Sequence, residues 1–412
     1  MNTFPRSCHA LVFAGIAFLL LVRTAAAQED FLDTLDDHLK FSAFNGNVSA
    51  RLSGLMDMEG YYLERPAPGL IQTDRNFLFN PRLTLFLDAQ IGEPFYFFMQ
   101  ARVDHSFDPG GTEYTSRMDE YALRYTPWKD ECLNVQAGKF ATVVGNWTSR
   151  HDSWENPFIT APLPYENLTS IWDIVAPDSG ATLNSWLVSE KNLRIPIIWG
   201  PSYTSGVSVF GHLGKFDYAA EVKNASISSR PEYWDGTSLG WDHPTTSGRL
   251  GFRPNEAWNL GVSASVGPYL SPEAVDGLPF AKGIGDYREF LVGQDMSFAW
   301  HHWQLWAEFF ETRFQVPNVG NADTFAYYVE AKYKFTPQLF GAVRWNQQVF
   351  GDVPDGMGGN IAWGSTTWRT DAAVTYRFTP HMQAKVQYSF LHQDSPFEQQ
   401  EHMVAAQFTI KF

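Results

Sequence analysis

The sequence predicts an all-β protein that closes into an antiparallel up-and-down transmembrane β-barrel of about 16 strands. Three observations lead to this fold class. Apolar and polar residues alternate over long runs, Thr-Pro turns separate several of the runs, and the sequence ends on an alternating stretch with a terminal phenylalanine. Alternation with a period of two is the pattern of a strand whose two faces meet different environments.

The first 27 residues have the layout of a secretory signal peptide. Arg6 precedes an apolar run over 11–22, and three alanines at 25–27 form a small-residue cleavage site. This run is too short to span a bilayer well, although an anchor that is not removed is the alternative.

Residues 28–45 differ from the rest of the chain. Phe31, Leu35 and Leu39 give weak helical spacing among acids, so we expect a short periplasmic segment here. The barrel is expected over 46–412, with a loop near 141–204 folded into its interior.

Composition narrows the class of protein. The chain carries a formal net charge of −15, which disfavours binding to nucleic acid. Aromatic residues make up 16% of it, and one of its two cysteines, Cys8, lies in the predicted signal peptide. Cys132 would then stand alone, so no intrachain disulfide is expected in the mature chain.

The alternation is clearest in the second half of the chain. Within 325–334, Phe325, Tyr327 and Val329 face one way, while Glu330 and Lys332 face the other. A helix would place charges within any apolar stripe, and the runs approach the roughly 9–11 residues of a tilted membrane strand. The expected strands are 47–57, 76–89, 95–105, 117–126, 132–140, 205–213, 215–223, 246–253, 257–266, 287–299, 302–312, 323–335, 339–349, 366–378, 382–391 and 401–412.

Proline marks the turns on one side of the barrel. Pro127, Pro337 and Pro380 follow the Thr of a Thr-Pro pair, and Pro254 ends a related stretch. Proline lacks the N–H that a strand ladder needs, so it belongs between strands. The strands that precede these turns are the fourth, eighth, twelfth and fourteenth, all even, as a barrel that starts from the periplasm requires. The segment 181–199 could add one hairpin and make 18 strands, but Pro196 favours a loop within the pore.

Aromatic residues near the strand ends indicate a membrane environment. They include Tyr125, Trp303, Tyr333 and Trp345, in the manner of the girdles at bilayer interfaces. In hydrocarbon no backbone polar group can stay unpaired, so the sheet must close on itself. We therefore expect the strand that ends at Phe412 to pair with the first.

Together, these features resemble a Gram-negative outer-membrane porin. The resemblance implies a place in the outer membrane, contact with its lipid and a homotrimer, and it assigns Phe412 to the signal read by the outer-membrane insertion machinery. A narrower likeness is to the phosphate-selective porin group, through Gly138, Lys139, Phe140 and Gly145. The chain departs from that group at 143–144, where Val-Val replaces the usual Pro-Phe.

Placing the apolar face toward lipid assigns the charged residues of the pore wall. Basic residues are the more numerous in this set, which predicts a mildly basic pore, although mixed charges that only keep the lumen hydrated are the alternative. The predicted pore-lining residues are Arg82, Arg102, Arg124, Glu308, Glu330, Lys332, Arg344, Arg369, Asp371 and Lys385.

The segment 141–180 is long and hardly alternates, and its tryptophans and prolines argue against disorder. By resemblance it is the loop that narrows the pore. It would filter small polar or anionic solutes or stack sugars on its aromatic rings; alternatively, the rings only attach the loop to the wall. The residues expected in this role are Trp147, Arg150, His151, Asp152, Trp154, Glu155 and Tyr165.

Catalytic patterns are weak. His301 and His302 are neighbours on a strand and would point to opposite faces, and Arg150–Asp152 lacks a placed nucleophile. The sequence therefore predicts no enzyme, no metal and no cofactor. The expected function is passive diffusion of small polar or ionic solutes through a water-filled pore. A surface adhesion or assembly barrel without transport, a sugar-specific channel and a soluble periplasmic β-protein are the alternatives.

Overall fold

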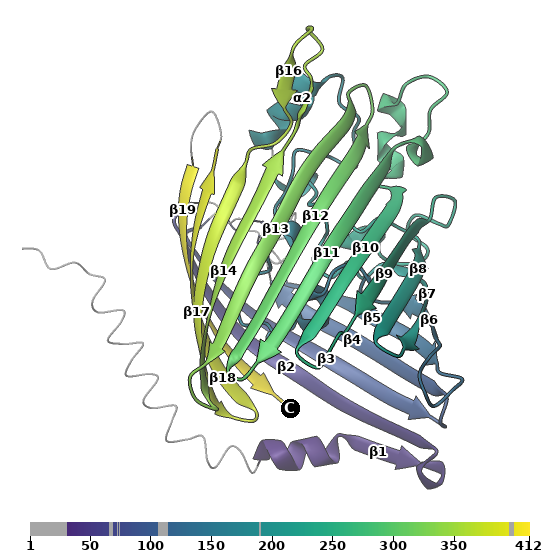
Figure 1. Cartoon of the computed structure of the whole chain (residues 1–412), viewed down its shortest axis with the longest axis vertical. Helices are drawn as coiled ribbons and strands as arrows, with labels where there is room; N and C mark the ends of the chain where they lie inside the picture. Colours follow the sequence, from purple (N-terminus) through teal and green to yellow (C-terminus); the bar gives the residue numbers. More distant parts are fainter. Residues whose placement is uncertain are drawn as a thin grey trace, which may run out of the picture.

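A closed antiparallel barrel of 16 strands dominates the computed structural model (Figure 1). The structure describes residues 31–65, 69–71, 73, 75–105, 114–188, 191–394 and 399–412, so the predicted signal peptide lies outside the described residues. The barrel strands are β2 (Val48–Leu63), β3 (Phe77–Ile91), β4 (Phe95–His105), β5 (Tyr114–Tyr125), β6 (Asn134–Lys139), β7 (Ser205–Leu213), β8 (Phe216–Lys223), β9 (Thr245–Phe252), β10 (Trp258–Pro268), β11 (Arg288–Trp300), β12 (Trp303–Val316), β13 (Gly320–Lys334), β14 (Leu339–Phe350), β17 (Thr367–Thr379), β18 (Met382–Gln393) and β19 (Gln399–Lys411).

The barrel closes where the sequence analysis expects it to. β19 pairs with β2 from Met403 opposite Leu63 to Lys411 opposite Leu55. Beyond that point a short strand, β1 (Lys40–Ala43), pairs with the same edge of β2. The edge of β2 that β19 leaves open is thereby hydrogen-bonded as well, which avoids an unpaired edge near the bilayer. The prediction of a 16-stranded antiparallel barrel is confirmed.

The segment that could have made an eighteen-stranded barrel is not a strand pair. It contains α2 (Gly180–Ser185) and the 3-10 turns η4 (Trp186–Val188) and η5 (Lys191–Leu193). Ser179 caps α2 by accepting a hydrogen bond from the backbone N–H of Thr182. The remaining short elements are a helical stretch at 31–38, β15 (Asp352–Pro354) paired with β16 (Asn360–Ala362), η1 (Phe44–Gly46), η2 (Trp147–Arg150), η3 (Leu163–Tyr165), η6 (Pro231–Tyr233), η7 (Pro272–Gly277) and η8 (Ile284–Asp286).

Exposure alternates along the strands as the sequence pattern predicts. Val343 and Val386 are 60% and 55% exposed on the outside of the barrel, whereas their neighbours Arg344 and Gln387 are buried inside it. An apolar outer face and a polar inner face are the arrangement of a membrane-spanning barrel. Within the described part of the chain, no helix is long and apolar enough to cross a membrane.

A β-bulge interrupts the alternation in β5. Glu120 lies opposite Gln100 and Met118 opposite Ala101, so Asp119 is the extra residue. Because the bulge adds one residue, the side chains that point into the barrel are Arg117 and Asp119 up to the bulge and Glu120 and Arg124 after it.

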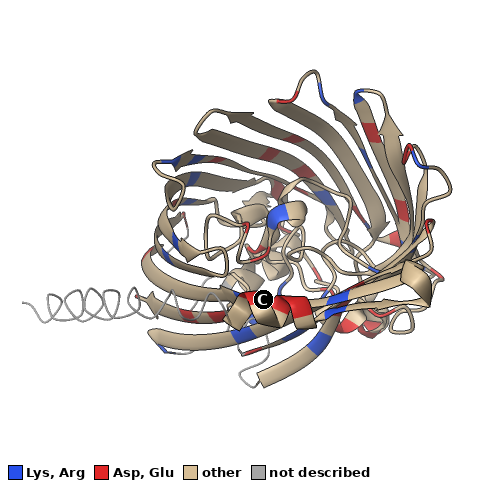
Figure 2. Ribbon diagram, turned by 90° about the horizontal axis from the view of Figure 1, so that it is seen from below, with Lys and Arg blue, Asp and Glu red and all other residues tan. Residues whose placement is uncertain are grey.

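The two ends of the barrel differ. At the lower end in Figure 1, tight turns such as 214–215 and 301–302 join the strands; we call this the short-turn end. The connections at the opposite end, the long-loop end, include 140–204, 224–244 and 269–287. The first of these, which we call the inner loop, runs from β6 to β7. Figure 2 looks along the barrel and shows irregular segments crossing its interior, ringed by charged residues on the strands.

Candidate functional site: the lumen and its inner loop

Glu308 of β12 holds the beginning and the middle of the inner loop. Its Oε1 accepts the backbone N–H of Trp147 at 2.9 Å, and its Oε2 accepts the hydroxyl of Tyr165 at 2.6 Å. The rings of Trp147 and Tyr165 pack together with centroids 4.7 Å apart. A buried carboxylate that accepts several hydrogen bonds ties these parts of the loop to one point of the wall.

Arg150 anchors the loop to β13. It donates to Glu330 at 2.7 Å and to the hydroxyl of Tyr328 at 3.1 Å, and its guanidinium lies 4.3 Å from the centre of the Trp306 ring. Breaking a buried ion pair by removing one partner costs about 3–5 kcal/mol, so this contact constrains the loop strongly.

The later part of the loop is attached to β14, β17 and β18. Arg344 donates to the carbonyl of Thr160 at 3.1 Å, and Arg369 donates to the carbonyl of Ala161 at 2.6 Å and to Glu166. Lys385 donates to the carbonyls of Ser153, Asn156 and Phe158 at 2.9, 2.7 and 3.3 Å. The inner loop therefore covers the wall from β12 to β18.

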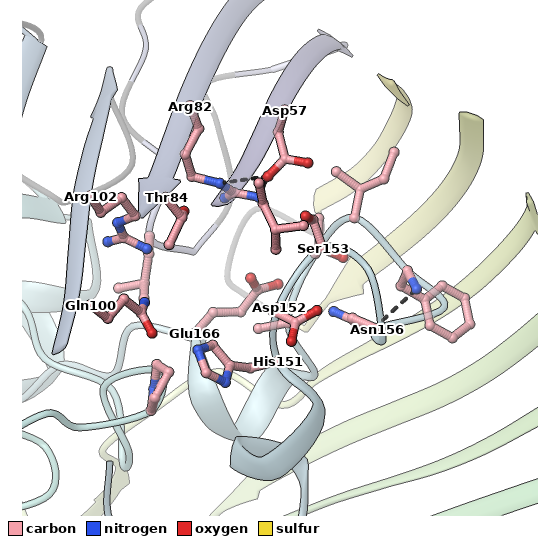
Figure 3. A pocket seen from close by; sticks show the side chains of 18 of the residues that line it. Asp57, Arg82, Thr84, Gln100, Arg102, His151, Asp152, Ser153, Asn156 and Glu166 are labelled. Atoms are coloured by element: carbon pink, nitrogen blue, oxygen red, sulfur yellow. Dashed lines mark hydrogen bonds and ion pairs between the residues drawn. The ribbon is translucent and has the colours of Figure 1, made fainter. Parts of the chain in front are cut away.

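A cavity, which we call the passage, lies on the other side of the inner loop, against β2 to β5. Arg82, Arg102 and Arg117 come from three neighbouring strands and line one side of it, while His151 and Asp152 of the loop line the other. Figure 3 shows Arg82, Arg102 and Gln100 on the wall with His151 and Asp152 facing them.

Carboxylates in the wall pair with these arginines. Arg82 contacts Asp57 at 3.0 Å and Glu59 at 2.7 Å. Arg102 and Arg117 both contact Asp119, at 3.2 and 2.6 Å. The arginine side chains keep 11–17% of their surface exposed, whereas these three acids keep at most 1%. The guanidinium groups are thus more exposed than the acids that pair with them, of which Asp57 also lines the passage.

A second space continues the lumen toward the short-turn end. Arg124 lines it and lies over the rings of Tyr96, Phe98 and Phe210, at 5.4, 5.8 and 5.0 Å from their centres. This space and the passage adjoin, because the same four residues line both: Phe86, Gln100, His151 and Asp152.

His151 is held at this junction by both ring nitrogens. Nδ1 lies 2.6 Å from the carbonyl of Thr148, and Nε2 contacts the hydroxyl of Tyr203. Burial lowers the pKa of the His151 imidazole, which the nearby Asp152 opposes. The neutral ring is therefore the favoured form at neutral pH.

The ten predicted pore-lining residues fall into three groups. Arg82 and Arg102 line the passage, and Arg124 lines the second space. Lys332 is half-buried against the ring of Phe340. The other six are buried beneath the inner loop: Glu308, Glu330, Arg344, Arg369, Asp371 and Lys385.

The seven predicted loop residues divide in a similar way. Trp147, His151 and Asp152 line the passage. Arg150 and Tyr165 point into the wall, Trp154 lies under the guanidinium of Arg377, and Glu155 is exposed.

Sequence reasoning missed four charged residues of the passage wall. Asp57 lies at the last position of the predicted first strand, and Glu59 lies beyond it, because β2 continues to Leu63. The alternation through Tyr61 and Leu63 could have shown that the strand continues. Arg117 and Asp119 were missed because the bulge in β5 shifts the inward face, and no sequence signal marks it.

A comparable charge cluster stands elsewhere on the wall. Arg249 of β9 contacts Asp217 at 2.8 Å and Asp295 at 2.7 Å. None of the three lines the passage.

No protein-family model matches the chain, and no curated protein sequence matches it. Solved structures do match. An anion-selective porin from Comamonas acidovorans aligns with a TM-score of 0.56 at 10% identity, over 89% of this chain and 100% of that one. OmpF of Salmonella typhi, in complex with daunomycin, aligns with a TM-score of 0.55 at 13% identity, over 90% and 100%.

A third match corrects one prediction. OmpT of Vibrio cholerae, described as an outer membrane protein in a trimer form, aligns with a TM-score of 0.53 at 9% identity, over 89% of this chain and 99% of that one. That description names no channel, and one fold can serve catalysis as well as transport. The prediction that the chain is not an enzyme is therefore wrong, because a barrel of this fold does not exclude catalysis.

At these identities the matches show the fold alone. The resemblance to Gram-negative outer-membrane porins is confirmed at that level, and the chain has the structure of an outer-membrane β-barrel.

Proposed function

We propose that the chain is an outer-membrane channel through which small polar and ionic solutes diffuse passively. The observation that supports this most directly is the pair of adjoining spaces along β2 to β5, which leave one side of the lumen uncovered. The inner loop covers the opposite side of the lumen. A solute would therefore pass along the guanidinium groups of Arg82, Arg102 and Arg117.

We further propose that the pore discriminates little between simple cations and anions. The predicted mildly basic wall rests on a set that left out several paired acids, among them Asp57, Glu59 and Asp119. Their charges offset those of the arginines, so the long-range field in the passage is weak.

Planar-bilayer recording tests the channel. The purified full chain should give discrete conductance steps in potassium chloride, and their absence from a folded preparation would overturn the proposal. Deleting 147–165 should raise the step size, because the inner loop occupies part of the lumen. Shortening the outer turn at 355–359 is the control and should leave the step size unchanged. Equal steps in both variants would contradict a constricting role.

We also propose a homotrimer, by likeness to the trimer form of OmpT. In a trimer, neighbouring subunits would cover part of the barrel wall. The short strands β6, β8 and β9 favour such an arrangement, because they have 6, 8 and 8 residues, whereas a typical membrane strand has roughly 9–11. Light scattering on the detergent-purified protein should give three times the chain mass, corrected for detergent.

A further inference from the structure

We infer that the hairpin formed by β1 and the start of β2, with its turn at 44–47, is a membrane anchor that binds phospholipid at the surface of the bilayer. Phe41 and Phe44 are the residues that would contact the lipid, at the boundary between headgroups and acyl chains. The inference needs the outer-membrane barrel but not the proposed channel. It replaces the expectation that all of 28–45 lies in the periplasm.

The pairing of β1 with β2 places Phe41 on the outer face of the barrel. Leu55 and Asp57 of β2 line the passage, so alternation turns Ala50 and Leu52 outward. Phe41 pairs with Ala50, and residues directly opposite each other in an antiparallel pair share a face. Phe41 is 61% exposed there. The apolar outer surface therefore extends from β2 onto β1.

The strand register also gives the depth of Phe41, because directly paired residues form rows around the outside of the barrel. One row contains the exposed rings of Phe95 and Tyr125, and aromatic residues of this kind mark the bilayer interface. This row consists of Ala43, Val48, Ile91, Phe95 and Tyr125. The next row toward the middle of the membrane consists of Phe41, Ala50, Ala89, Phe97 and Leu123. Since tight turns lie at the periplasmic end of such barrels, β1 is level with the periplasmic leaflet.

Phe44 adds a second exposed ring, in a backbone conformation that a bulky residue disfavours. Asn45 and Gly46 have φ of +57° and +87° and form the two-residue turn that this pair prefers. Phe44 precedes the turn, yet its own φ is +52°, which costs free energy for a residue with a large side chain. Because Phe44 is 76% exposed, packing within the chain offsets little of that cost. Transfer of the ring from water to the bilayer interface would offset it.

The charged residues of the hairpin lie on its opposite face. Lys40 and Arg51 are directly paired, and Asp36 of the helical stretch contacts both, at 3.1 and 2.7 Å. Asp37 contacts Lys40 at 2.9 Å. In Figure 1 the helical stretch and β1 lie along the lower end of the barrel. A polar and an apolar face are typical of an interfacial element, and because the acids offset both cations, apolar contact rather than anionic lipid would hold it.

The anchor lies beside the seam of the barrel. Phe412 at the end of β19 bonds to Gly54, and two residues further along the same edge of β2 the carbonyl of Leu39 accepts the N–H of Leu52 at 3.0 Å. β1 has only 4 residues, and so short a strand is weakly held by its ladder alone. Lipid contacts at Phe41 and Phe44 would keep β1 in place on the edge that β19 leaves open.

Site-specific fluorescence quenching tests the contact with lipid. In a Cys132→Ser background, Phe41→Cys and Ser42→Cys are each labelled with an environment-sensitive dye, and the protein is placed in phosphatidylcholine nanodiscs. Lipids brominated on the acyl chain should quench the dye at 41, and aqueous iodide should quench the dye at 42, which lies on the other face. Quenching of position 41 by iodide alone would overturn the inference. Protection of position 41 from both quenchers would assign it to a contact between copies of the chain, and would overturn lipid binding as well.

A second measurement keeps Phe41 in place. Phe44→Asn removes the ring and introduces a residue that tolerates positive φ. If lipid holds the hairpin, trypsin should cut after Lys40 roughly ten-fold faster in this variant than in wild type, in the same nanodiscs. In water, relief of the backbone strain would protect the hairpin instead, so an unchanged or slower cut would overturn the inference.

Phe280→Asn is the matched control for the protease experiment. Phe280 is a fully exposed ring in the loop 269–287, at the opposite end of the barrel. This substitution should leave the rate of cutting after Lys40 unchanged, and an equal acceleration in both variants would contradict the anchor. Neither experiment measures ion conductance, so the proposed channel stands or fails separately.

Discussion

Gly145 shows how one residue shapes the inner loop. Its φ is +77°, and a Cβ there would lie 2.3 Å from the hydroxyl oxygen of Tyr165. Only glycine combines that backbone conformation with so close a contact. The loop can therefore bring Tyr165 to Glu308 only while residue 145 has no side chain.

We predict that Gly145→Ala loosens the inner loop. The backbone conformation alone costs roughly 1–2 kcal/mol for a residue with a Cβ, and the clash with Tyr165 adds to it. The single-channel conductance should rise and the urea midpoint of unfolding should fall. Gly200→Ala is the matched control, because its φ is +49° but a Cβ there meets nothing within 4 Å. Equal effects of the two substitutions would show that the contact with Tyr165 does not matter.

Because His151 is largely buried, we predict that the stability of the folded protein depends on pH. Burial lowers the pKa of its imidazole below the ordinary value of about 6.5, so the folded state favours the neutral ring. The stability that His151 contributes is then complete above that value and is lost as the pH falls below it. The charged and polar groups around the ring are Arg102, Asp119, Asp152, Tyr203 and the carbonyl of Thr148.

As the pH falls below about 6.5, the melting temperature of wild type should therefore drop more steeply than that of His151→Gln. Carboxylates elsewhere titrate equally in both proteins, so the difference between the two curves reports His151. Parallel curves would mean that the ring is solvated in the folded protein.

At the scale of an element, the bulge in β5 decides which residues reach the lumen. Without it, strict alternation from Arg124 and Glu120 would place Met118 inside and Arg117 in lipid. With it, Met118 is outside, where 37% of its surface is exposed, and Arg117 lines the passage. A bulge that redirects a side chain at a functional surface is a common use of this irregularity.

Cysteine labelling tests the register of β5 in the membrane. In a Cys132→Ser background, a charged, membrane-impermeant thiol reagent should modify Arg117→Cys and leave Met118→Cys unmodified, since only the first faces water. Labelling of position 118 instead would place the bulge elsewhere.

At the scale of the whole molecule, closure depends on the junction of β2 with the end of β19. Phe412 exchanges backbone hydrogen bonds with Gly54, at 2.8 and 3.0 Å. Its ring lies where a side chain of residue 54 would be, because a Cβ there would come within 2.4 Å of the ring. The glycine thus lets the ring of the terminal aromatic residue lie close to β2.

We predict that Gly54→Ala weakens this closure. A Cβ at 54 must displace the Phe412 ring, and overpacking of this kind typically costs about 1–3 kcal/mol. The folded, fast-migrating band on unheated gels should disappear at a lower temperature than in wild type. Gly60→Ala on the same strand is the control, since a Cβ there meets nothing within 4 Å. Identical transitions for the two variants would refute the packing role of Gly54.

The sequence by itself determined the barrel. Lipid on one side and water on the other impose a period of two on every spanning strand, so the windows around Val343 and Val386 could be assigned without coordinates. The requirement that no backbone group stay unpaired in hydrocarbon then predicted that the last strand meets the first. Both conclusions follow from local pattern and solvent, and neither needs long-range contacts.

Only the tertiary structure decided which wall residues meet the pore. Arg150 and Glu330 are 180 residues apart in sequence, yet their ion pair helps to hold the inner loop over one side of the lumen. Alternation assigns both Arg82 and Arg344 to the inner face but cannot distinguish the one in the passage from the one beneath the loop. That distinction arises from hydrogen bonds between the inner loop and distant strands, and from one extra residue in β5 that leaves no mark in the pattern.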